Sequence, residues 1–324
     1  MEIIVVKFGG TSVADERARA AAIGQIKNIL KEGYGVVAVV SAMGRKGAPY
    51  ATDTLLSLVR PAGESSPRTR DLLMTCGETI SACVFADSLE QEGVKAMPMN
   101  GMTAGIKTDG VYNAAEITGM DTGRVIKAVE EGYVPVITGF QGISENCDMT
   151  TLGRGGSDTS AVAIGGYLGA RGVYIYTDVP GIAETDPRIV KEARFLKEVD
   201  AEDMLTLAEN GAGIIHPRAV RTGVGFGVPV WVRSTFDSDP GTAIVHLDPK
   251  PAGLVGLALK KGLPGEEPMA AVTVVAHPVT EEAVSKAKAA LPGADIAKEG
   301  DVLRAEVKET EAADAVRALY DIFH

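Results

Sequence analysis

Val5-Val6-Lys7-Phe8-Gly9-Gly10-Thr11-Ser12, residues 5–12, is the stretch that decides the fold. The apolar residues 3–6 predict a strand, which delivers a lysine and two glycines into a loop, and a helix is predicted to begin at Asp15. Glycine N–H groups with no Cβ in the way, together with one cation, can cradle a polyphosphate. A glycine pair after a strand is more often only a tight turn, so this stretch alone leaves both interpretations open.

A second glycine loop, Leu152-Gly-Arg-Gly-Gly-Ser-Asp-Thr-Ser160, favours phosphate binding. Like the first loop, it leads into a predicted helix, where Gly155 and Gly156 would add further backbone donors. Two such loops predict phosphoryl transfer, which needs mainly positioning and charge neutralisation. A Walker P-loop is excluded because the nearest match, residues 101–108, has the wrong spacing, and no dinucleotide-binding fingerprint is present.

The composition is that of a folded protein with an acidic surface. Its 324 residues predict two domains, or one with an appendage. Lys and Arg number 32 against 43 Asp and Glu, so the net charge is −11. This balance argues against nucleic acid or an anionic membrane as partner, but not against ATP, whose site needs only local positive charge. No signal peptide or bilayer-spanning stretch of about 20 apolar residues is expected, so we predict a cytoplasmic protein.

The cysteines are not expected to form disulfides or a structural zinc site. Cys76, Cys83 and Cys147 show no CxxC spacing and are accompanied by only four histidines. We expect reduced, buried thiols.

Strand-like and helix-like segments alternate from residue 1 to about 245. Strands are predicted at residues 3–8, 35–41, 94–99, 134–140, 172–177 and 228–234, and helices at 15–32, 71–90 and 121–131. Apolar strands between helices predict an α/β domain, with a mostly parallel sheet sandwiched by helices. Such sheets bind ligands beyond the carboxyl ends of their strands. Lys7, Ser41, Asn100, Gly139 and Asp178 lie at such ends and are expected to converge.

The pattern changes around residues 237–253, where Pro and Gly cluster with Asp. Beyond it, strands are predicted at 254–260, 271–276, 294–297 and 302–307, with helices at 279–291 and 310–322. This ββαββα order predicts a small α+β domain. We therefore expect a catalytic domain over residues 1–245 and a second domain over 250–324.

Four charged side chains suit phosphoryl transfer. Lys7 can neutralise the β- and γ-phosphates, and Asp158 can hold Lys7 in place, although a helix-capping role explains Asp158 almost as well. Arg154 can grip a carboxylate through two hydrogen bonds. Glu78, on a predicted helix, either faces a substrate ammonium or is a solvated helix charge.

Six collinear motifs resemble those of aspartate kinases in the amino-acid kinase family. They are Lys7-Phe-Gly-Gly-Thr-Ser-Val13, Ser41-Ala-Met-Gly44, Ala51-Thr-Asp53, Cys76-Gly-Glu78, Gly153-Arg-Gly-Gly-Ser-Asp158 and Thr177-Asp178 with Asp186-Pro-Arg188. They cover residues 1–245, and the segment from Gly44 to Tyr50 resembles the diaminopimelate-sensitive type. The resemblance implies the amino-acid kinase fold and transfer of the ATP γ-phosphoryl group to the side-chain carboxylate of L-aspartate. The product, 4-phospho-L-aspartate, begins lysine (diaminopimelate), threonine and methionine biosynthesis.

The resemblance also implies roles for individual residues. Lys7 and Asp158 would be catalytic. L-Aspartate would be bound by Ser41, Thr52, Glu78, Arg154 and Ser157. The nucleotide would be bound by Lys7, Phe8, Gly9, Gly10, Gly155, Gly156, Thr177, Asp178, Ala183, Glu184, Asp186 and Arg188, with Mg²⁺ bridging the phosphates and no protein residue assigned to the metal. No general base is needed, because the attacking carboxylate is already ionised at neutral pH.

Two departures affect the nucleotide site. The family usually has a lysine that contacts the nucleotide where this chain has Gly213. Either Arg188 or Arg218 substitutes for it in part, or ATP binding or turnover is weak. The segment Val179-Pro-Gly-Ile-Ala183 also differs from the common Val-Asp-Gly-Val-Tyr, which affects the contacts to the base.

The tail departs further from the family. Aspartate kinases generally carry two ACT modules, one inserted in the other, whereas residues 250–324 suffice for one. We expect the inserted, effector-binding module to be absent and the remaining ACT-like module to support a homodimer. The turn His277-Pro278-Val279 lacks the usual glycine, so weak or no feedback inhibition is predicted.

Two other functions remain possible at this point. One is a kinase of another acidic amino acid, and the other is a catalytically weak, amino-acid-binding regulatory subunit. Turnover with L-aspartate distinguishes all three.

Overall fold

The computed structural model describes residues 1–264 and 267–324, which form two compact units. The first unit comprises Met1–Pro180 and Arg221–Pro240. The second comprises Gly181–Val220 and Gly241–His324.

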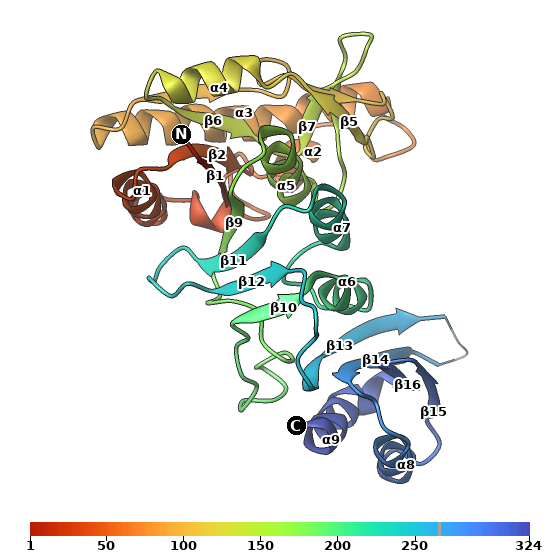
Figure 1. Ribbon diagram of the computed structural model, residues 1–324. Helices are drawn as coiled ribbons and strands as arrows, with labels where there is room; N and C mark the ends of the chain where they lie inside the picture. Colours follow the sequence, from red (N-terminus) through yellow and green to blue (C-terminus); the bar gives the residue numbers. More distant parts are fainter. Residues whose placement is uncertain (265–266) are drawn as a thin grey trace. The chain divides into compact units, whose positions relative to one another are not determined.

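Six parallel strands of the large sheet form the centre of the first unit, in the order β11-β9-β1-β2-β6-β3 (Figure 1). The strands are β1 (Ile3–Phe8), β2 (Gly35–Val40), β3 (Ala96–Met99), β6 (Val134–Thr138), β9 (Gly172–Thr177) and β11 (Val230–Ser234). Every residue of β2 and β6 is buried, because helices cover both faces. The predicted α/β fold is confirmed, and the strand limits agree to within two residues.

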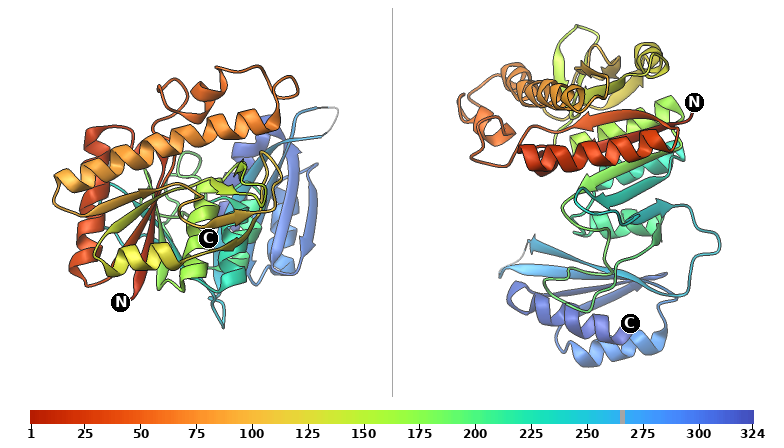
Figure 2. Two further views of the ribbon diagram at one scale, coloured as in Figure 1. Left: turned by 90° about the horizontal axis from the view of Figure 1, so that it is seen from above. Right: turned by 90° about the vertical axis from the view of Figure 1, so that its left-hand side faces the viewer.

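Helices α1 (Glu16–Lys31) and α3 (Pro67–Gln91) cover one face of this sheet, and Figure 2 shows them next to each other. Helix α1 begins where the sequence predicted, because the Asp15 carboxylate caps it by accepting a hydrogen bond from Ala18 N. Its side chains Ile23 and Ile26 join one buried cluster with Phe85 of α3. Helices α4 (Gly123–Glu130) and α5 (Gly156–Leu168) cover the other face, and the short α2 (Thr52–Leu56) precedes α3.

Helix α3 is the one described helix that is long and apolar enough to cross a membrane, judged by length and composition. Half of its most apolar segment is buried in the protein, where Phe85 and Leu89 are fully enclosed. This burial is that of a core helix.

A second, smaller sheet in the first unit was not predicted. Its order is β5-β4-β7-β8, from β4 (Ile106–Thr108), β5 (Ile117–Met120), β7 (Gln141–Ile143) and β8 (Met149–Thr151). Strands of three or four residues are too short to show an alternating pattern. Residues 101–105 form the turn that the sequence suggested, and Asn100 stabilises it by accepting a hydrogen bond from Thr103 N (2.9 Å).

The second unit ends in an antiparallel sheet of order β13-β14-β16-β15 with two helices. Its elements are β13 (Gly253–Leu263), β14 (Met269–His277), α8 (Glu281–Ala290), β15 (Asp295–Glu299), β16 (Val302–Lys308) and α9 (Ala312–Phe323). This ββαββα order is the predicted one and fits an ACT-like domain. The unit also contains β10 (Glu198–Asp200) paired in parallel with β12 (Thr242–Val245), and α6 (Ala201–Glu209). Helix α7 (Pro217–Phe226) contains the boundary between the units.

Residues 181–220 and 241–249 belong to the same compact unit as the C-terminal residues. The Tyr320 hydroxyl donates to Glu184 Oε2 (2.8 Å), and Leu257 N donates to the Glu184 carbonyl (2.6 Å). These long-range contacts place the boundary differently from residue 245. The predicted division into a catalytic domain (1–245) and a regulatory and dimerisation domain (250–324) concerns function and stays a prediction.

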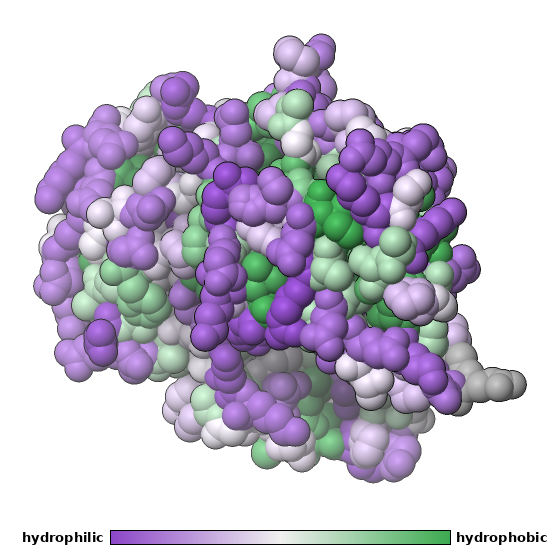
Figure 3. Space-filling model, turned by 90° about the horizontal axis from the view of Figure 1, so that it is seen from below, coloured by the Kyte–Doolittle hydropathy of each residue, from purple (hydrophilic) through white to green (hydrophobic). Residues whose placement is uncertain are grey.

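Figure 3 shows one face of the molecule, on which hydrophilic side chains surround smaller apolar patches. The expectation of buried thiols is wrong, because all three cysteines are exposed and unpaired. Cys76 and Cys83 are seven residues apart and so lie on the same outer side of α3. Cys147 lies between β7 and β8 at a positive φ of 61°.

Candidate active site

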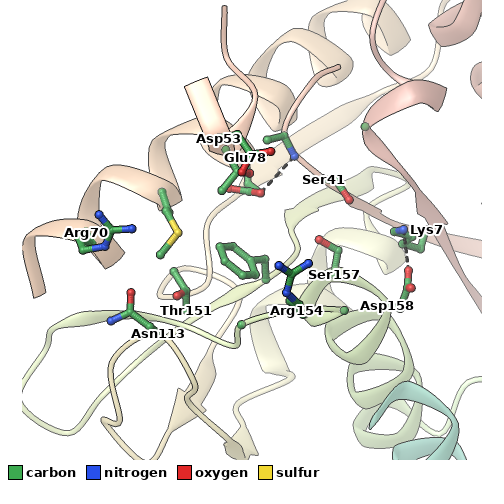
Figure 4. A pocket seen from close by; sticks show the side chains of 18 of the residues that line it. Lys7, Ser41, Asp53, Arg70, Glu78, Asn113, Thr151, Arg154, Ser157 and Asp158 are labelled. Atoms are coloured by element: carbon green, nitrogen blue, oxygen red, sulfur yellow. Dashed lines mark hydrogen bonds and ion pairs between the residues drawn. The ribbon is translucent and has the colours of Figure 1, made fainter. Parts of the chain in front are cut away.

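A cavity of about 550 Å³ lies in the first unit at the carboxyl ends of β1 and β2 (Figure 4). The described residues that line it are Lys7, Gly10, Ser41, Ala42, Gly44, Thr52, Asp53, Arg70, Met74, Glu78, Asn113, Phe140, Thr151, Gly153, Arg154, Gly155, Gly156, Ser157 and Asp158. The position agrees with the rule for parallel sheets. The cavity therefore defines the candidate site.

A lysine–aspartate pair lies at one end of this cavity. Lys7, the penultimate residue of β1, places its Nζ 2.6 Å from Asp158 Oδ1, in the first turn of α5. Both side chains are mostly buried, with 12% and 16% of their surfaces exposed. The pair thus holds the Lys7 ammonium group at the N-terminus of α5, as the sequence suggested.

Two glycine loops bring backbone groups to the same place. Gly155 caps α5 with a left-handed φ of 69°, and no described side chain caps the helix. The first N–H groups of a helix have no intrahelical acceptor, and Gly155, Gly156 and Ser157 at the start of α5 line the cavity. A Cβ on Gly10 would lie 2.6 Å from the carbonyl oxygens of both Ala42 and Gly44. Only glycine permits this close approach of the loops after β1 and β2. The end of the cavity near Lys7 therefore offers donors and one cation to an anion.

Glu78 lies inside the cavity and is 3% exposed, so the solvated-helix interpretation is wrong. Its Oε1 accepts a hydrogen bond from Ala42 N (3.2 Å), while its buried Oε2 has no hydrogen-bond partner among the described residues. Burial raises the pKa of Glu78 to about 7, against the opposing effect of backbone hydrogen bonds. A carboxylate with an unsatisfied buried oxygen suits a bound ammonium group.

Two arginines line the same cavity as Glu78. Arg154 is exposed and makes no ion pair with any described residue, and Figure 4 shows it between Thr151 and Ser157. Arg70 lies further along the cavity and donates to the Arg60 carbonyl (3.1 Å). A guanidinium group without a protein partner can bind a ligand carboxylate through two hydrogen bonds.

The structure brings most of the expected site residues into this one cavity. Those that line it are Lys7, Gly10, Ser41, Thr52, Glu78, Arg154, Gly155, Gly156, Ser157 and Asp158. Phe8 is instead fully buried and stacks on Tyr176, with ring centroids 5.0 Å apart. Gly9 is adjacent to the cavity, and an added Cβ there would lie 3.6 Å from Lys7 Nζ.

The expected nucleotide residues beyond β9 do not line the cavity. Asp178 follows Thr177 at the carboxyl end of β9, and its carboxylate pairs with Arg45 (3.1 Å). Asp186 pairs with Arg188 (2.7 Å) in the second unit. These nucleotide assignments, with that of Ala183, stay predictions.

Glu184 has partners within the second unit for both of its carboxylate oxygens. Arg194 donates to Oε1 (2.8 Å), and Tyr320 donates to Oε2. Burial would raise the pKa of Glu184, but these hydrogen bonds outweigh it and lower the pKa. The side chain is therefore committed to the protein, and its contacts do not support the predicted role in nucleotide binding.

Several lining residues were not predicted. Asp53, Arg70, Met74, Asn113, Phe140 and Thr151 are among them. Arg70, Met74 and Glu78 are spaced by four residues on α3, and this helical spacing is a signal that the sequence contains. Asn113 and Thr151 reach the cavity through tertiary contacts that no local pattern reveals.

The residues fit Mg²⁺ only as a metal carried by phosphate groups. No group of three His, Cys, Asp or Glu side chains in the described part of the chain could hold a metal ion. Mg²⁺ usually keeps waters and binds through one or two carboxylates together with substrate phosphates. An ion that arrives with a nucleotide is compatible with this cavity.

The fold and the cavity together define a protein of the amino-acid kinase class, with two glycine loops and a lysine–aspartate pair at the carboxyl edge of a parallel sheet. The family model described as "Amino acid kinase family" matches residues 2–234. The chain belongs to this family, and the curated relatives that it resembles include several aspartokinases.

Aspartokinase 1 of Bacillus subtilis is 48% identical over 245 residues, which cover 75% of this chain and 61% of the relative. Aspartokinase of Mycolicibacterium smegmatis is 41% identical over 303 residues, covering 91% of this chain and 69% of the relative. The chain thus spans about three fifths of the length of the Bacillus relative. It also resembles the structure of E. coli aspartokinase III in complex with aspartate and ADP, with a TM-score of 0.82, 21% identity and 99% of each chain covered. This last likeness concerns the fold.

Proposed function

We propose that the chain is an aspartate kinase that transfers the γ-phosphoryl group of ATP to the side-chain carboxylate of L-aspartate. The observation that carries the proposal is the buried Oε2 of Glu78, which has no hydrogen-bond partner in the described part of the chain and lies in the same cavity as Arg154 and the Lys7–Asp158 pair. An amino acid with a second carboxylate presents one ammonium and two carboxylates. Glu78 suits the ammonium group, Arg154 suits one carboxylate, and the other carboxylate is left to react.

In this proposal the protein acts mainly by positioning and charge neutralisation. An oxygen of the substrate carboxylate attacks the γ-phosphorus while the bond from that phosphorus to the bridging oxygen of ADP breaks. Lys7, held by Asp158, and the N–H groups at the start of α5 offset the phosphate charge. Bound Mg²⁺ would neutralise further charge on the phosphates. Ser41, Thr52 and Ser157 offer hydroxyl groups that orient the substrate.

The proposal includes a cytoplasmic location, where ATP is available, and a homodimer formed through the C-terminal module of the second unit. The family resemblance of that module supports the dimer. Because the chain spans about three fifths of several relatives, activity and assembly must be measured on this chain itself.

The decisive experiment measures ADP release by the purified chain with ATP, Mg²⁺ and L-aspartate, and with L-glutamate and N-acetylglutamate as alternative acceptors. We expect release that depends on L-aspartate alone. Equal release with L-glutamate would indicate a kinase of another acidic amino acid. No release from folded protein would leave the regulatory-subunit function in its place.

A variant ties the activity to this cavity. Arg154→Ala is expected to raise the KM for L-aspartate at least about tenfold, because a charge-assisted hydrogen bond contributes about 1.5–3 kcal/mol. Arg124→Ala, on the exposed part of α4, is the matched control and should leave the KM unchanged.

A further inference from the structure

A second cavity, of about 420 Å³, lies in the first unit and has no part in the proposed reaction. It is lined by Gln25, Asn28, Ile29, Lys31 and Glu32 of α1 and its end, by Tyr174 and Tyr176 of β9, by Arg233 of β11, and by Ser238. None of these residues lines the cavity that holds Lys7 and Glu78. The two cavities therefore have separate walls.

Arg233 is the charged group that characterises this second cavity. Its Cζ lies 4.9 Å from the ring centroid of Tyr174 and 5.8 Å from that of Tyr176, so the aromatic faces hold the guanidinium group. Its Nε is buried without a hydrogen-bond partner, and no carboxylate among the described residues forms an ion pair with Arg233. A partly buried cation without a counter-ion is costly unless a ligand supplies the charge.

The remaining lining favours an anion over a cation. Lys31 is exposed on the rim and has no ion-pair partner in residues 1–264 or 267–324, whereas Glu32 is the one acidic residue of the lining. Two cations against one carboxylate leave a positive balance. The Tyr176 hydroxyl adds no negative charge, because a phenol is protonated at neutral pH and burial raises the pKa of Tyr176 further, to about 12.

The walls of the cavity are fixed in place, so it does not depend on a ligand for its shape. The Gln25 side chain donates to the Asp237 carbonyl (2.9 Å), which joins α1 to the segment after β11. Tyr176 stacks on Phe8, and Arg233 is opposite Tyr176 in the pairing of β11 with β9. A preformed, charged cavity of this size is typical of small-molecule sites.

We propose that this cavity binds a small phosphate- or carboxylate-bearing anion through the N–H edge of Arg233, at a site separate from the substrate cavity. Stacking on the tyrosines uses the faces of the guanidinium group and leaves its edge for one or two anionic oxygens. Lys31 adds attraction at the entrance.

The protein contains its own reporter for this site. Trp231 is the single tryptophan of the chain and contacts Tyr174 edge-on, with ring centroids 5.3 Å apart. Titration with inorganic phosphate, and separately with succinate, at constant ionic strength should change the Trp231 fluorescence in a saturable way at millimolar concentrations or below. The anion that saturates at the lower concentration identifies the preferred chemistry.

Variants assign the signal to one of the two cavities. Arg233→Gln should abolish the saturable change, Lys31→Gln should weaken the affinity several-fold, and Arg154→Gln in the substrate cavity should leave it intact. Arg233→Lys, which keeps the charge, and thermal melting of each variant control for folding. If Arg233→Gln does not fold, Lys31→Gln decides alone. No saturable change with either anion, a change that persists in Arg233→Gln, or an affinity that Lys31→Gln leaves unaltered would overturn the proposal.

Discussion

At the residue scale, Glu78 has a carboxyl group that the protein buries without a counter-charge. Replacing Glu78 by Gln is expected to raise the KM for L-aspartate by about 10- to 100-fold, because the bound ammonium loses a charge-assisted hydrogen bond worth about 1.5–3 kcal/mol. The KM for ATP should change little. Steady-state kinetics with each substrate varied test this, with Glu90→Gln on the exposed side of the same helix as control. Equal effects of both variants would remove Glu78 from the aspartate site.

The raised pKa of Glu78 leads to a second prediction, on how stability and L-aspartate affinity depend on pH. Burial raises this pKa from the ordinary 4.5 to about 7, so the folded protein binds more protons than the unfolded chain between these values. Stability relative to Glu78→Gln should therefore fall as pH rises from about 4.5 to about 7, by no more than about 3 kcal/mol. Affinity for L-aspartate should rise through about pH 7, because the ionised form binds the ammonium. Urea unfolding across this pH range tests the stability, and the KM for L-aspartate tests the affinity. If the difference in stability between the unchanged protein and Glu78→Gln does not depend on pH, the prediction is wrong.

Gly213 stands where the family resemblance implies a nucleotide-binding lysine. A Cβ added there would meet no atom within 4 Å, so the fold accommodates a side chain. Gly213→Lys is expected to lower the KM for ATP or raise kcat. Gly225→Lys is the matched control, because that position is also open. If Gly213→Lys changes neither kinetic constant, the missing lysine has no functional consequence in this chain.

The Lys7–Asp158 pair was predictable from the sequence, because Lys7 lies at the end of β1 and Asp158 at the start of α5, and both elements have clear sequence patterns. For Glu78 the sequence left two interpretations open, since burial depends on what packs against α3. The partners of Arg233 were not predictable at all, because they come from α1 and β9, which are distant in the sequence.

At the scale of elements, Asp71 joins α3 to the small sheet. Its carboxylate is fully buried and accepts hydrogen bonds from Thr151 N (2.9 Å), Thr151 Oγ1 (2.7 Å) and Asn113 N (3.0 Å). Both partners line the substrate cavity. Asp71→Ala is expected to destabilise the protein by about 3 kcal/mol, because it leaves buried donors unsatisfied, and to raise the KM for L-aspartate.

Thermal melting and kinetics measure these two effects. Asp87→Asn, an exposed change on the same helix, should alter stability by less than about 0.5 kcal/mol. Asp71→Asn, which keeps one acceptor oxygen, should lie between Asp71→Ala and the unchanged protein. If Asp71→Ala melts like Asp87→Asn, the small sheet does not depend on this carboxylate.

The elements of the large sheet were predictable because continuous apolar strands alternate with amphipathic helices such as α1. The small sheet was not, because β4, β7 and β8 have three residues each and are held by contacts such as Asp71 to Thr151, which are 80 residues apart.

At the scale of the whole molecule, the second unit contains a charged cluster that should make its stability depend on pH. His277 Nε2 lies 2.7 Å from Asp203 and Nδ1 lies 3.0 Å from Asp301. Burial alone would lower the pKa of His277, but hydrogen bonds and charge from the two carboxylates outweigh it and raise the pKa above 6.5. The stabilisation is therefore fully present below about pH 6.5 and is lost as pH rises through the higher folded-state pKa.

Urea unfolding followed by circular dichroism, at about pH 6 and about pH 9, measures this effect. His277→Gln should destabilise the protein more at the lower pH. His246→Gln is the control, because 82% of that side chain is exposed. If His277→Gln lowers the free energy of unfolding equally at both pH values, the pKa of His277 does not differ between the folded and unfolded states.

The order of elements in both parts of the chain was predictable, but the division into units was not. Residues 181–220 follow the large sheet in the sequence yet pack with the C-terminal helices, through contacts such as Glu184 with Tyr320. Composition indicates a boundary near residues 237–253, but it does not reveal that an earlier segment packs with the C-terminal helices.

The turn after β14 leads to the last prediction, on regulation. Its sequence, His277-Pro278-Val279, has no glycine that would let a ligand approach the backbone closely. Two carboxylates hold the His277 ring. The Val279 N–H already donates to Asp301 Oδ1 (3.4 Å). An amino-acid effector would have to displace these contacts to bind there. We therefore expect lysine, threonine and diaminopimelate at sub-millimolar concentrations, singly or in pairs, to leave ADP release unchanged. Inhibition of the wild-type chain by any of them would contradict this expectation of unchanged ADP release.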